Sequence, residues 1–545
     1  NPYFGYTFFQ PRQARQPAQN KFLVEKPVGS VRVLVLGESA AMGFPNPEFG
    51  LARTLKAVLQ EQYPGVVIEV IDGTMTMINS HILRGIAEEA LEYEPDVVVI
   101  YAGNNEAIGP YGPAGVFGRF YSSGWMVRAD RWLRTHSAVV RRLSGVWPRR
   151  SDPGGDTWRG LDHFARHPLA DVDPGVDRAR RFFRENLSAM LDGAVARNIP
   201  VVIAAPAVNL TDWPPLHSFE PVGRADWPVR VEAAKEAMVA GRWQSAVEAW
   251  REALRGAPGH AGIHYGLAVC LDRLGLRDEA LSSFERACDL DGYRFRADSR
   301  MAAIVKEEAA GRREKRVTEV EVRRDLARHD PAEPMFLEHV HFTLAGMYEL
   351  AARLAPAVAA STPGLASLTP RTFDRGRVWS ALFVQPDVQE SAWAGTGLFL
   401  QMSVFRGQEG YAKRVEDVAE RRERAAELAQ RVGVNSLKEA YAGQRLDEAS
   451  GWAVRGVYAD VLLRRGAAAA AIPVLREAIE AKPNRAEYYQ LLGHAYYLER
   501  DLDQAAEALE KALELHPYYA DAWNSLGLVW YLRGSRERAG ACYRE

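Results

Sequence analysis

The sequence predicts an α/β protein: a parallel β-sheet covered by helices on both faces, with an inserted pair of helical repeats and an all-α repeat array after it. Three observations predict this class. Short runs of β-branched residues alternate with longer amphipathic segments from residue 31 to 105. These short runs are apolar throughout, which is typical of parallel strands buried on both faces. Two later regions repeat their own pattern every 34 residues, which indicates an array of helix pairs.

The first predicted elements alternate in the order strand, helix, strand, helix, strand. A helix over 176–198 then leads into a fourth strand, IPVVIAAPAV at 199–208. Such sheets bind ligands at the carboxyl ends of their strands, and Ser39 and Asn105 follow two of those ends. The first three predicted strands are VRVLVLG at 31–37, VVIEVID at 66–72 and PDVVVIYAG at 95–103.

Residues 107–175 interrupt this alternation. Glycine, proline, tryptophan and arginine are scattered through the segment with little periodicity. A long aperiodic segment beside a strand end is more typical of a lid or specificity loop than of a core element. We therefore predict a lid or specificity insertion over 107–175.

Composition limits the function classes. The 545 residues are 47% hydrophobic and 25% charged, which predicts a globular chain of several domains. Sixty-eight Lys and Arg against 70 Asp and Glu give a net charge of -2, so nothing in the overall charge supports nucleic-acid binding. Cys270, Cys288 and Cys542 lie too far apart for a metal or redox motif, and no apolar run reaches the roughly 18 residues of a membrane-spanning helix.

The C-terminal region repeats a pattern of bulky, small and helix-ending residues in phase. Small residues let two helices approach, aromatic residues fill the space between them, and proline ends the second helix. The pattern resembles the tetratricopeptide (TPR) helix pair. Its members are Ala471, Leu475, Ala478 and Pro483, then Tyr489, Leu492, Gly493, Tyr496, Ala505, Leu509, Ala512 and Pro517, and then Trp523, Leu526, Gly527, Trp530, Ala539 and Tyr543.

The same phase appears in the middle of the chain, which predicts a TPR pair inserted after the fourth strand. The last C-terminal repeat stops at Glu545 within its second helix, so we expect the natural protein to continue beyond that residue. The mid-chain positions are Ala246, Trp250, Ala253 and Pro258, followed by Ala280, Phe284 and Ala287.

Three short motifs follow one another at the expected strand ends and loops: GES at 37–39, GNNE at 103–106 and EHVH at 338–341. In this order they resemble blocks I, III and V of the SGNH, or GDSL-like, hydrolases, which read G-D-S, G-x-N-D and D-x-x-H. The resemblance covers about residues 28–225 and 292–356. With its repeats, the chain is similar to a bacterial subgroup of SGNH proteins fused to TPR arrays.

The resemblance implies a serine nucleophile at Ser39, activated by His341 as general base. Glu338 would hold the His341 imidazole in the required tautomer. Glu338 stands where the family usually has aspartate, which changes its reach by one methylene. A Ser39–His341 dyad without the carboxylate is the alternative.

The resemblance also implies an oxyanion hole made by the backbone amide of Ser39 and the side-chain amide of Asn105. The family's block II contributes a glycine N–H, and the residue best placed for this by spacing is Met77. Because any residue except proline can donate a backbone N–H, the hole survives this replacement. Asn79 would line the same rim, and Arg296 would contact an acidic substrate group.

Several of these residues have a plainer interpretation. Ser39 is also a candidate helix N-cap, Asn105 a turn residue and Arg296 a structural ion-pair partner. His339 competes with His341 for the role of base, and we prefer His341 because of the family spacing. The two histidines and Glu338 could also bind zinc by residue type, but helical zinc motifs place histidines four apart and no further ligand is evident.

The predicted division of the chain follows from these patterns. It comprises an N-terminal extended segment at 1–27, the first part of the SGNH domain at 28–225 with its insertion at 107–175, TPR repeats at 226–291, the second part of the SGNH domain at 292–356, a helical linker at 357–448 and C-terminal TPR repeats at 449–545.

The resemblance implies a serine esterase or O-acyltransferase that needs no cofactor and no metal. Its expected substrate is an O-acyl ester, such as an O-acetylated carbohydrate. TPR grooves usually bind peptides or proteins, so we expect a partner protein in a larger assembly. The alternative is an inactive SGNH–TPR scaffold that works by protein–protein interaction alone.

The chain begins at Asn1 rather than methionine, which suggests a signal sequence or membrane anchor upstream. We therefore expect an extracytoplasmic location, periplasmic or at the cell surface, with the cytoplasm as the alternative.

Overall fold

The computed structural model describes most of the chain. The described residues are 17–18, 20–114, 123–137, 161, 166–221, 226–327, 330, 332–408, 410–444, 446 and 451–544. Most of the predicted N-terminal segment at 1–27 lies outside these ranges, as does much of the predicted lid at 107–175.

A five-stranded, all-parallel sheet forms the N-terminal part of the molecule, in the order β2-β1-β3-β4-β5. This confirms the predicted α/β class. The fifth strand was not predicted, because three residues are too few to show a strand pattern. The strands are β1 (Val31–Gly37), β2 (Ile68–Thr74), β3 (Val97–Tyr101), β4 (Val201–Ala204) and β5 (Val317–Glu319).

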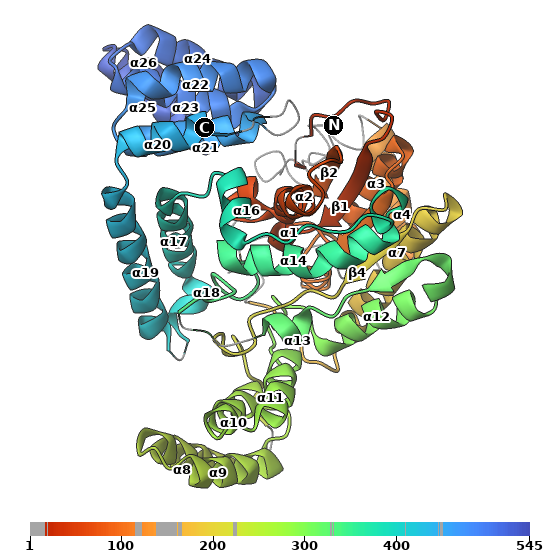
Figure 1. The fold of residues 1–545 in the computed structure, drawn as a ribbon. Helices are drawn as coiled ribbons and strands as arrows, with labels where there is room; N and C mark the ends of the chain where they lie inside the picture. The colour runs from red at the N-terminus through yellow and green to blue at the C-terminus, as the bar shows by residue number, and fades with distance from the viewer. Residues whose placement is uncertain are drawn as a thin grey trace.

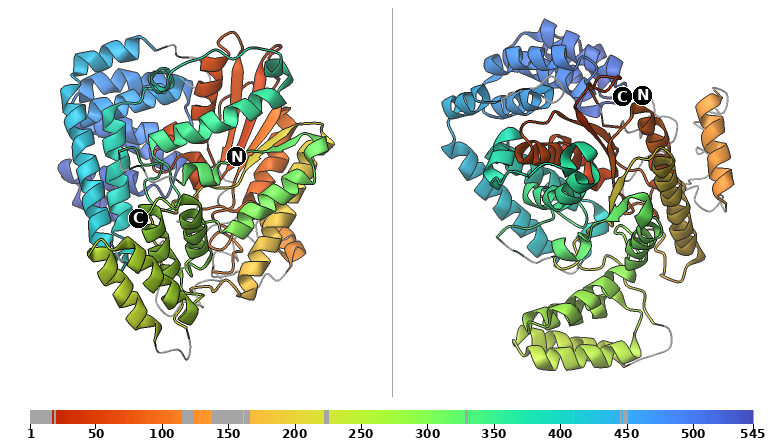
Figure 2. Two further views of the ribbon diagram at one scale, coloured as in Figure 1. Left: turned by 60° about the horizontal axis from the view of Figure 1, so that its bottom comes forward. Right: turned by 45° about the vertical axis from the view of Figure 1, so that its right-hand side comes forward.

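Helices cover both faces of this sheet, as Figures 1 and 2 show. Alternate residues of β1 face opposite layers: Val33 and Val35 join the core under α2 and α14, and Leu34 and Leu36 join the core under α3, α7 and α12. The helices are α2 (Leu51–Gln62), α14 (Leu344–Ser361), α3 (Ser80–Ala90), α7 (Pro174–Ala196) and α12 (Ser299–Ala310).

Short elements connect these layers. They are α1 (Ser39–Met42), η3 (Pro47–Phe49), η4 (Leu91–Tyr93), η6 (Arg313–Lys315) and α13 (Arg323–Leu326). The longer helix α4 (Gly124–His136) lies within the predicted insertion at 107–175.

Two helix pairs lie between β4 and α12 and extend away from the sheet at the bottom of Figure 1. Gly266 explains why a small residue recurs in their pattern. A Cβ at Gly266 would lie 2.4 Å from the ring of Trp250, so only glycine lets this indole pack against the neighbouring helix. The helices are α8 (Trp227–Val239), α9 (Trp243–Gly256), α10 (Ala261–Arg273) and α11 (Arg277–Asp289).

The last part of the chain is all helical and ends in three further helix pairs, the blue array of Figure 1. Gly493 repeats the close approach seen at Gly266, since a Cβ there would lie 2.6 Å from Leu509. The linking helices are α15 (Pro363–Ala366), α16 (Arg375–Ala381), α17 (Pro386–Leu400), α18 (Ser403–Arg406), α19 (Tyr411–Arg431) and α20 (Val434–Ala442). The array consists of α21 (Gly451–Arg464), α22 (Ala468–Ala481), α23 (Ala486–Leu498), α24 (Leu502–Leu515), α25 (Ala520–Leu532) and α26 (Arg536–Cys542).

The array contacts the α/β part through a cluster of charged and aromatic side chains. Arg485, just before α23, pairs with Glu48 of η3 at 2.5 Å. The Arg485 guanidinium also lies 5.0 Å from the centre of the Trp452 ring, and the ammonium of Lys482 contacts the backbone carbonyl of Asn20. The first helices of the array are therefore anchored beside the segment that follows Ser39.

The three cysteines are buried and unpaired with one another. None of the helices in the described ranges combines the length and apolar character needed to cross a bilayer.

Candidate active site

Ser39 is the first residue of α1, directly after the turn that ends β1. This turn is possible because residue 37 is a glycine. A Cβ at Gly37 would lie 2.4 Å from the Cβ of Ala41 and 2.8 Å from the carbonyl oxygen of Tyr101. The tight strand-to-helix turn brings Ser39 to the carboxyl edge of the sheet.

His341 meets Ser39 at this edge. Its Nε2 lies 2.9 Å from the Ser39 Oγ. The loop that carries His341 folds back on itself, with an antiparallel bridge between Phe336 and Phe342 and a 2.8 Å hydrogen bond from the Leu337 N–H to the His341 carbonyl. The loop is therefore a defined turn that fixes the direction of the imidazole.

Glu338 contacts the other nitrogen of the same ring. Its Oε1 is bonded to the Nδ1 of His341 and also accepts the backbone N–H of His341 at 2.8 Å. Burial on its own raises the pKa of the Glu338 carboxyl, but the adjacent imidazoles of His339 and His341 outweigh burial and hold this pKa well below its usual range. An ionised carboxylate at this place is an acceptor, which favours the His341 tautomer that carries its hydrogen on Nδ1.

Phe44 packs against the same imidazole. Its ring centre lies 4.9 Å from that of His341, and the residue is 39% exposed. Its backbone N–H donates to the carbonyl of Ser39 at 3.2 Å, which holds it next to the serine. Sequence reasoning missed Phe44, and only its position five residues after the serine could have indicated it.

Two buried glutamates tie the surrounding loops together. Glu38 accepts the backbone N–H groups of Gly103, Asn104 and Asn105 at 3.0–3.3 Å, which joins the turn after β1 to the loop after β3. Glu106 accepts the N–H and the hydroxyl of Ser80 at 2.8 Å each, which joins that loop to the start of α3.

Glu38 and Glu106 are both buried, and the pKa of each is raised. Burial, and then the neighbouring Glu106 carboxylate, raise the pKa of Glu38 well above its usual range. Burial raises the pKa of Glu106 to about 7, although both hydrogen bonds from Ser80 lower it. Burial therefore favours the protonated form of both carboxyls.

The two further residues that the resemblance placed at the oxyanion hole lie on loops that contact one another. Asn105 donates its side-chain amide to the carbonyl of Ile78 at 2.9 Å, and an amide nitrogen carries a second hydrogen for another acceptor. Met77, one residue earlier, has a φ of 60°, in the left-handed region that favours glycine. The backbone at Met77 thus has a conformation that suits the glycine of the family pattern.

Asn79 and Arg296 are held by protein groups. Asn79 is fully buried, and its amide nitrogen donates to the carbonyl of Pro110 at 2.8 Å. Arg296 donates to the carbonyls of Asn209 and Trp213 at 2.7 and 2.8 Å and pairs with Asp291 at 3.0 Å. These contacts agree with the structural interpretation of Arg296 and leave the predicted substrate contact without support.

The structure also bears on the plainer interpretations of Ser39 and His339. The N-cap of α1 is Glu38, so Ser39 does not cap the helix and its hydroxyl lies at His341 instead. His339 points into a set of aromatic rings and not toward the serine. Within the described ranges, no group of three His, Cys, Asp or Glu side chains is arranged to hold a metal ion.

Asn209 is a second residue that sequence reasoning missed. Its side-chain amide donates to the carbonyl of Glu338 at 3.1 Å, and its backbone N–H donates to the carbonyl of His339 at 2.9 Å. The loop after β4 therefore supports the loop that carries Glu338. Its place after a strand end was the one available signal.

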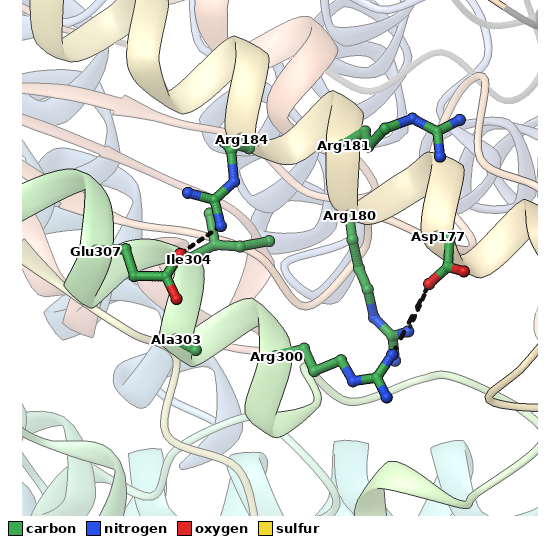
Figure 3. Close-up of a pocket in the computed structure, with 8 residues that line it drawn as sticks. All are labelled: Asp177, Arg180, Arg181, Arg184, Arg300, Ala303, Ile304 and Glu307. Carbon is green, nitrogen blue, oxygen red and sulfur yellow. Dashed lines mark hydrogen bonds and ion pairs between the residues drawn. The ribbon is translucent and has the colours of Figure 1, made fainter.

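A separate hollow of about 460 Å³ lies between α7 and α12 (Figure 3). Four arginines line it, but three of them are paired with the chain's own carboxylates. Arg180 bonds to Asp171 and Asp298, Arg184 pairs with Glu307 at 2.5 Å, and Arg300 lies 3.9 Å from Asp177. These pairs cross-link the two helices.

The arrangement of Ser39, His341 and Glu338 can perform nucleophilic chemistry. A serine hydroxyl within hydrogen-bond reach of an imidazole, whose other nitrogen is bonded to a buried carboxylate, is the recurring geometry of an activated serine. The hydrogen bond between Ser39 and His341 joins residues from the beginning and the end of the α/β part of the chain. Both residues lie at one edge of the sheet.

Comparisons with known proteins identify the helix pairs. Residues 231–294 and 491–545 match the tetratricopeptide repeat family, which confirms the predicted repeats in both places. No curated protein sequence matches the chain significantly.

Solved TPR proteins are similar to parts of the chain. MamA from Desulfovibrio magneticus RS-1 is 20% identical, covers 29% of this chain and 85% of its own, and has a TM-score of 0.21. YrrB, described as a TPR protein with an unusual peptide-binding site, is 15% identical over 55% of this chain and 90% of its own, with a TM-score of 0.18. The TPR2AB domain of yeast Sti1, in a pHSP90 complex, is 11% identical over 58% of this chain and 87% of its own, with a TM-score of 0.16. Because these TM-scores are low, the assignment of the repeats rests on the family match and on the helices themselves. This chain joins a five-stranded parallel α/β sheet to tetratricopeptide repeats.

Proposed function

We propose that the α/β part is a serine esterase or O-acyltransferase of SGNH type that works through an acyl-enzyme on Ser39. One observation carries the proposal: Nε2 of His341 lies 2.9 Å from Oγ of Ser39 while Nδ1 of the same ring is bonded to the buried Glu338. The motif resemblance at Gly37–Ser39, Gly103–Glu106 and Glu338–His341 supports the family assignment.

In the proposed reaction, Nε2 of His341 takes the proton of the Ser39 hydroxyl as the Oγ attacks the carbonyl carbon of an ester. The carbonyl oxygen becomes an oxyanion, which backbone N–H groups near Ser39 and Met77 and the amide of Asn105 would stabilise. The imidazolium then gives its proton to the leaving alcohol. The product of this half-reaction is an ester of Ser39.

The second half-reaction repeats these steps with a new acceptor. Water gives a free carboxylic acid, and an acceptor alcohol gives a transferred acyl group. The expected substrate is an O-acyl ester, with O-acetylated carbohydrate as the favoured class. The TPR repeats imply binding of partner proteins, and we propose that a partner recruits this unit into a larger assembly.

A fluorophosphonate probe tests the proposal, because it reacts only with an activated serine. We expect wild-type protein to be labelled at Ser39, as shown by mass spectrometry of the modified peptide, and Ser39→Ala to remain unlabelled. Ser282→Ala is a control, since Ser282 is an exposed serine on α11, outside the site, and it should label like wild type. Absence of labelling on folded wild-type protein would favour the scaffold alternative.

A further inference from the structure

Both carboxylate oxygens of Glu338 are held, although the proposed reaction uses only one. Oε1 serves His341, as described above. Oε2 accepts the backbone N–H of His339 at 2.7 Å, and the buried Nδ1 of the His339 ring, which has no hydrogen-bond partner, lies against the same oxygen. Glu338 and His339 are 3% and 4% exposed, so this second contact is made in a dry environment.

The His339 ring is enclosed by four aromatic rings from distant parts of the chain. The ring of Phe399 stacks on it at 5.8 Å with an interplanar angle of 12°. Trp213 lies at 5.8 Å, Phe295 at 6.0 Å and Phe405 at 6.3 Å. We call these four rings the aromatic box.

The aromatic box joins the serine site to the helical region. Trp213 lies after β4 and Phe295 after α11, whereas Phe399 belongs to α17 and Phe405 to α18. Aromatic rings packed at these distances leave a side chain little rotational freedom. The orientation of His339 is therefore fixed by segments outside the loop that carries it.

Glu338 needs such a second contact for a physical reason. In the SGNH pattern an aspartate stands at this position, and a glutamate has one more rotatable bond. A carboxylate that swings about this bond moves Oε1 away from Nδ1 of His341, and a misplacement of about 1 Å costs on the order of 100-fold in rate. A donor on Oε2 removes this freedom.

We propose that His339 is a positioning residue of the site: its Nδ1 holds Oε2 of Glu338 so that Oε1 faces His341, and the aromatic box holds His339. The inference deepens the proposed function and rests on it. It also makes α17 and α18 part of the structure that supports catalysis.

Two substitutions separate the contact to Glu338 from packing in the aromatic box. His339→Phe keeps an aromatic ring in the box but removes the nitrogen. His339→Asn gives up the ring but places an amide N–H near the position of Nδ1. Both are made in the full chain, with thermal unfolding as the control for folding.

The measurement is the rate of p-nitrophenyl acetate hydrolysis, resolved into kcat and KM, together with the rate of fluorophosphonate labelling. We expect His339→Phe to lower kcat by roughly 30- to 100-fold with KM changed less than about twofold. We expect His339→Asn to keep kcat within about fivefold of wild type. Wild-type kcat in His339→Phe, or equal losses in both variants, would overturn the inference and leave the proposed function standing.

A spectroscopic measurement distinguishes failure of the proposed function from failure of this inference. If wild-type protein is neither labelled nor active, the proposed function fails. The contact between His339 and Glu338 is then measured by NMR spectroscopy of ¹⁵N-histidine-labelled protein. The His339 resonances are assigned by comparison with His339→Asn. A hydrogen on Nδ1 of His339 that is lost in Glu338→Gln supports the contact. An unprotonated Nδ1 overturns it.

Discussion

Nε2 of His341 lies 2.9 Å from Oγ of Ser39, although 302 positions separate the two residues in the chain. The parallel sheet explains the meeting, because it brings the turn after β1 and the loop before α14 to one edge. Everything proposed about chemistry depends on this pair and on the carboxylate of Glu338 behind it.

The length of the Glu338 side chain can be tested directly. Glu338→Asp withdraws the carboxylate by one methylene from both imidazoles, and we expect esterase activity to fall by roughly 10- to 100-fold. Glu338→Gln removes the negative charge and no longer favours the His341 tautomer with its hydrogen on Nδ1. We expect it to lower esterase activity by about 10²- to 10⁴-fold. Steady-state hydrolysis of an activated ester checks both. Aspartate at wild-type activity would contradict the fitted geometry.

Met77 allows a test of the left-handed backbone in the proposed oxyanion hole. Met77→Gly suits a φ of 60°, so we expect an esterase rate within about threefold of wild type. Met77→Val puts a β-branched residue in the same conformation, and we expect the free energy of unfolding to drop by about 1–3 kcal/mol. Chemical denaturation and the hydrolysis rate measure both effects. Equal stability of the valine and glycine variants would rule out the strain.

The Glu38–Glu106 pair predicts a pH dependence of stability. Burial raises the pKa of Glu106 to about 7 from an ordinary value of 4.5, so the folded state binds more protons than the unfolded state between these values. The contribution of Glu106 to the free energy of unfolding is fully present below about pH 4.5. It falls as the pH rises toward 7, by on the order of 1–3 kcal/mol.

Glu106→Gln tests this dependence because it keeps the side-chain length and an acceptor for the Ser80 N–H. We expect a shallower decline in the free energy of unfolding from pH 5 to pH 7.5 than in wild type. Chemical denaturation at a series of pH values measures the slopes. Parallel slopes in the two proteins would show that Glu106 is not the group responsible.

A substitution of Arg296 distinguishes a role in substrate binding from a role in stabilising the fold. Its guanidinium donates to two backbone carbonyls and pairs with Asp291, and lysine cannot reproduce this fork. We expect Arg296→Lys to lower the free energy of unfolding by about 2–4 kcal/mol with little change in KM. Arg300→Lys is the matched control, since Arg300 is 59% exposed at its side chain. A stable Arg296→Lys with a raised KM would restore the substrate role.

Much of the fold could be predicted from the sequence, because its signals are local. Strands buried on both faces are apolar runs, as in β1, and TPR helices repeat a fixed pattern of small and bulky residues, as at Gly493 and Leu509. The β5 strand was missed because it owes its place to pairing with β4 and not to a pattern of its own.

The candidate site was predictable only where a motif carried it. The motifs led to Ser39, His341 and Glu338, and these three lie together. The aromatic box and Asn209 were not predicted, because their contacts join segments far apart in the chain that no periodicity or spacing connects. Asn79 shows the reverse case: its position near the motif suggested a rim residue, but its amide is used to hold the turn at Pro110.

The most direct measurement of the central claim is the mass of the protein during turnover of p-nitrophenyl acetate. Rapid acid quenching followed by peptide mass spectrometry should find one acetyl group on Ser39 in wild-type protein and none in Ser39→Ala or His341→Ala. An ester that is hydrolysed with no acetyl on Ser39, or an unchanged rate in Ser39→Ala, would contradict the account.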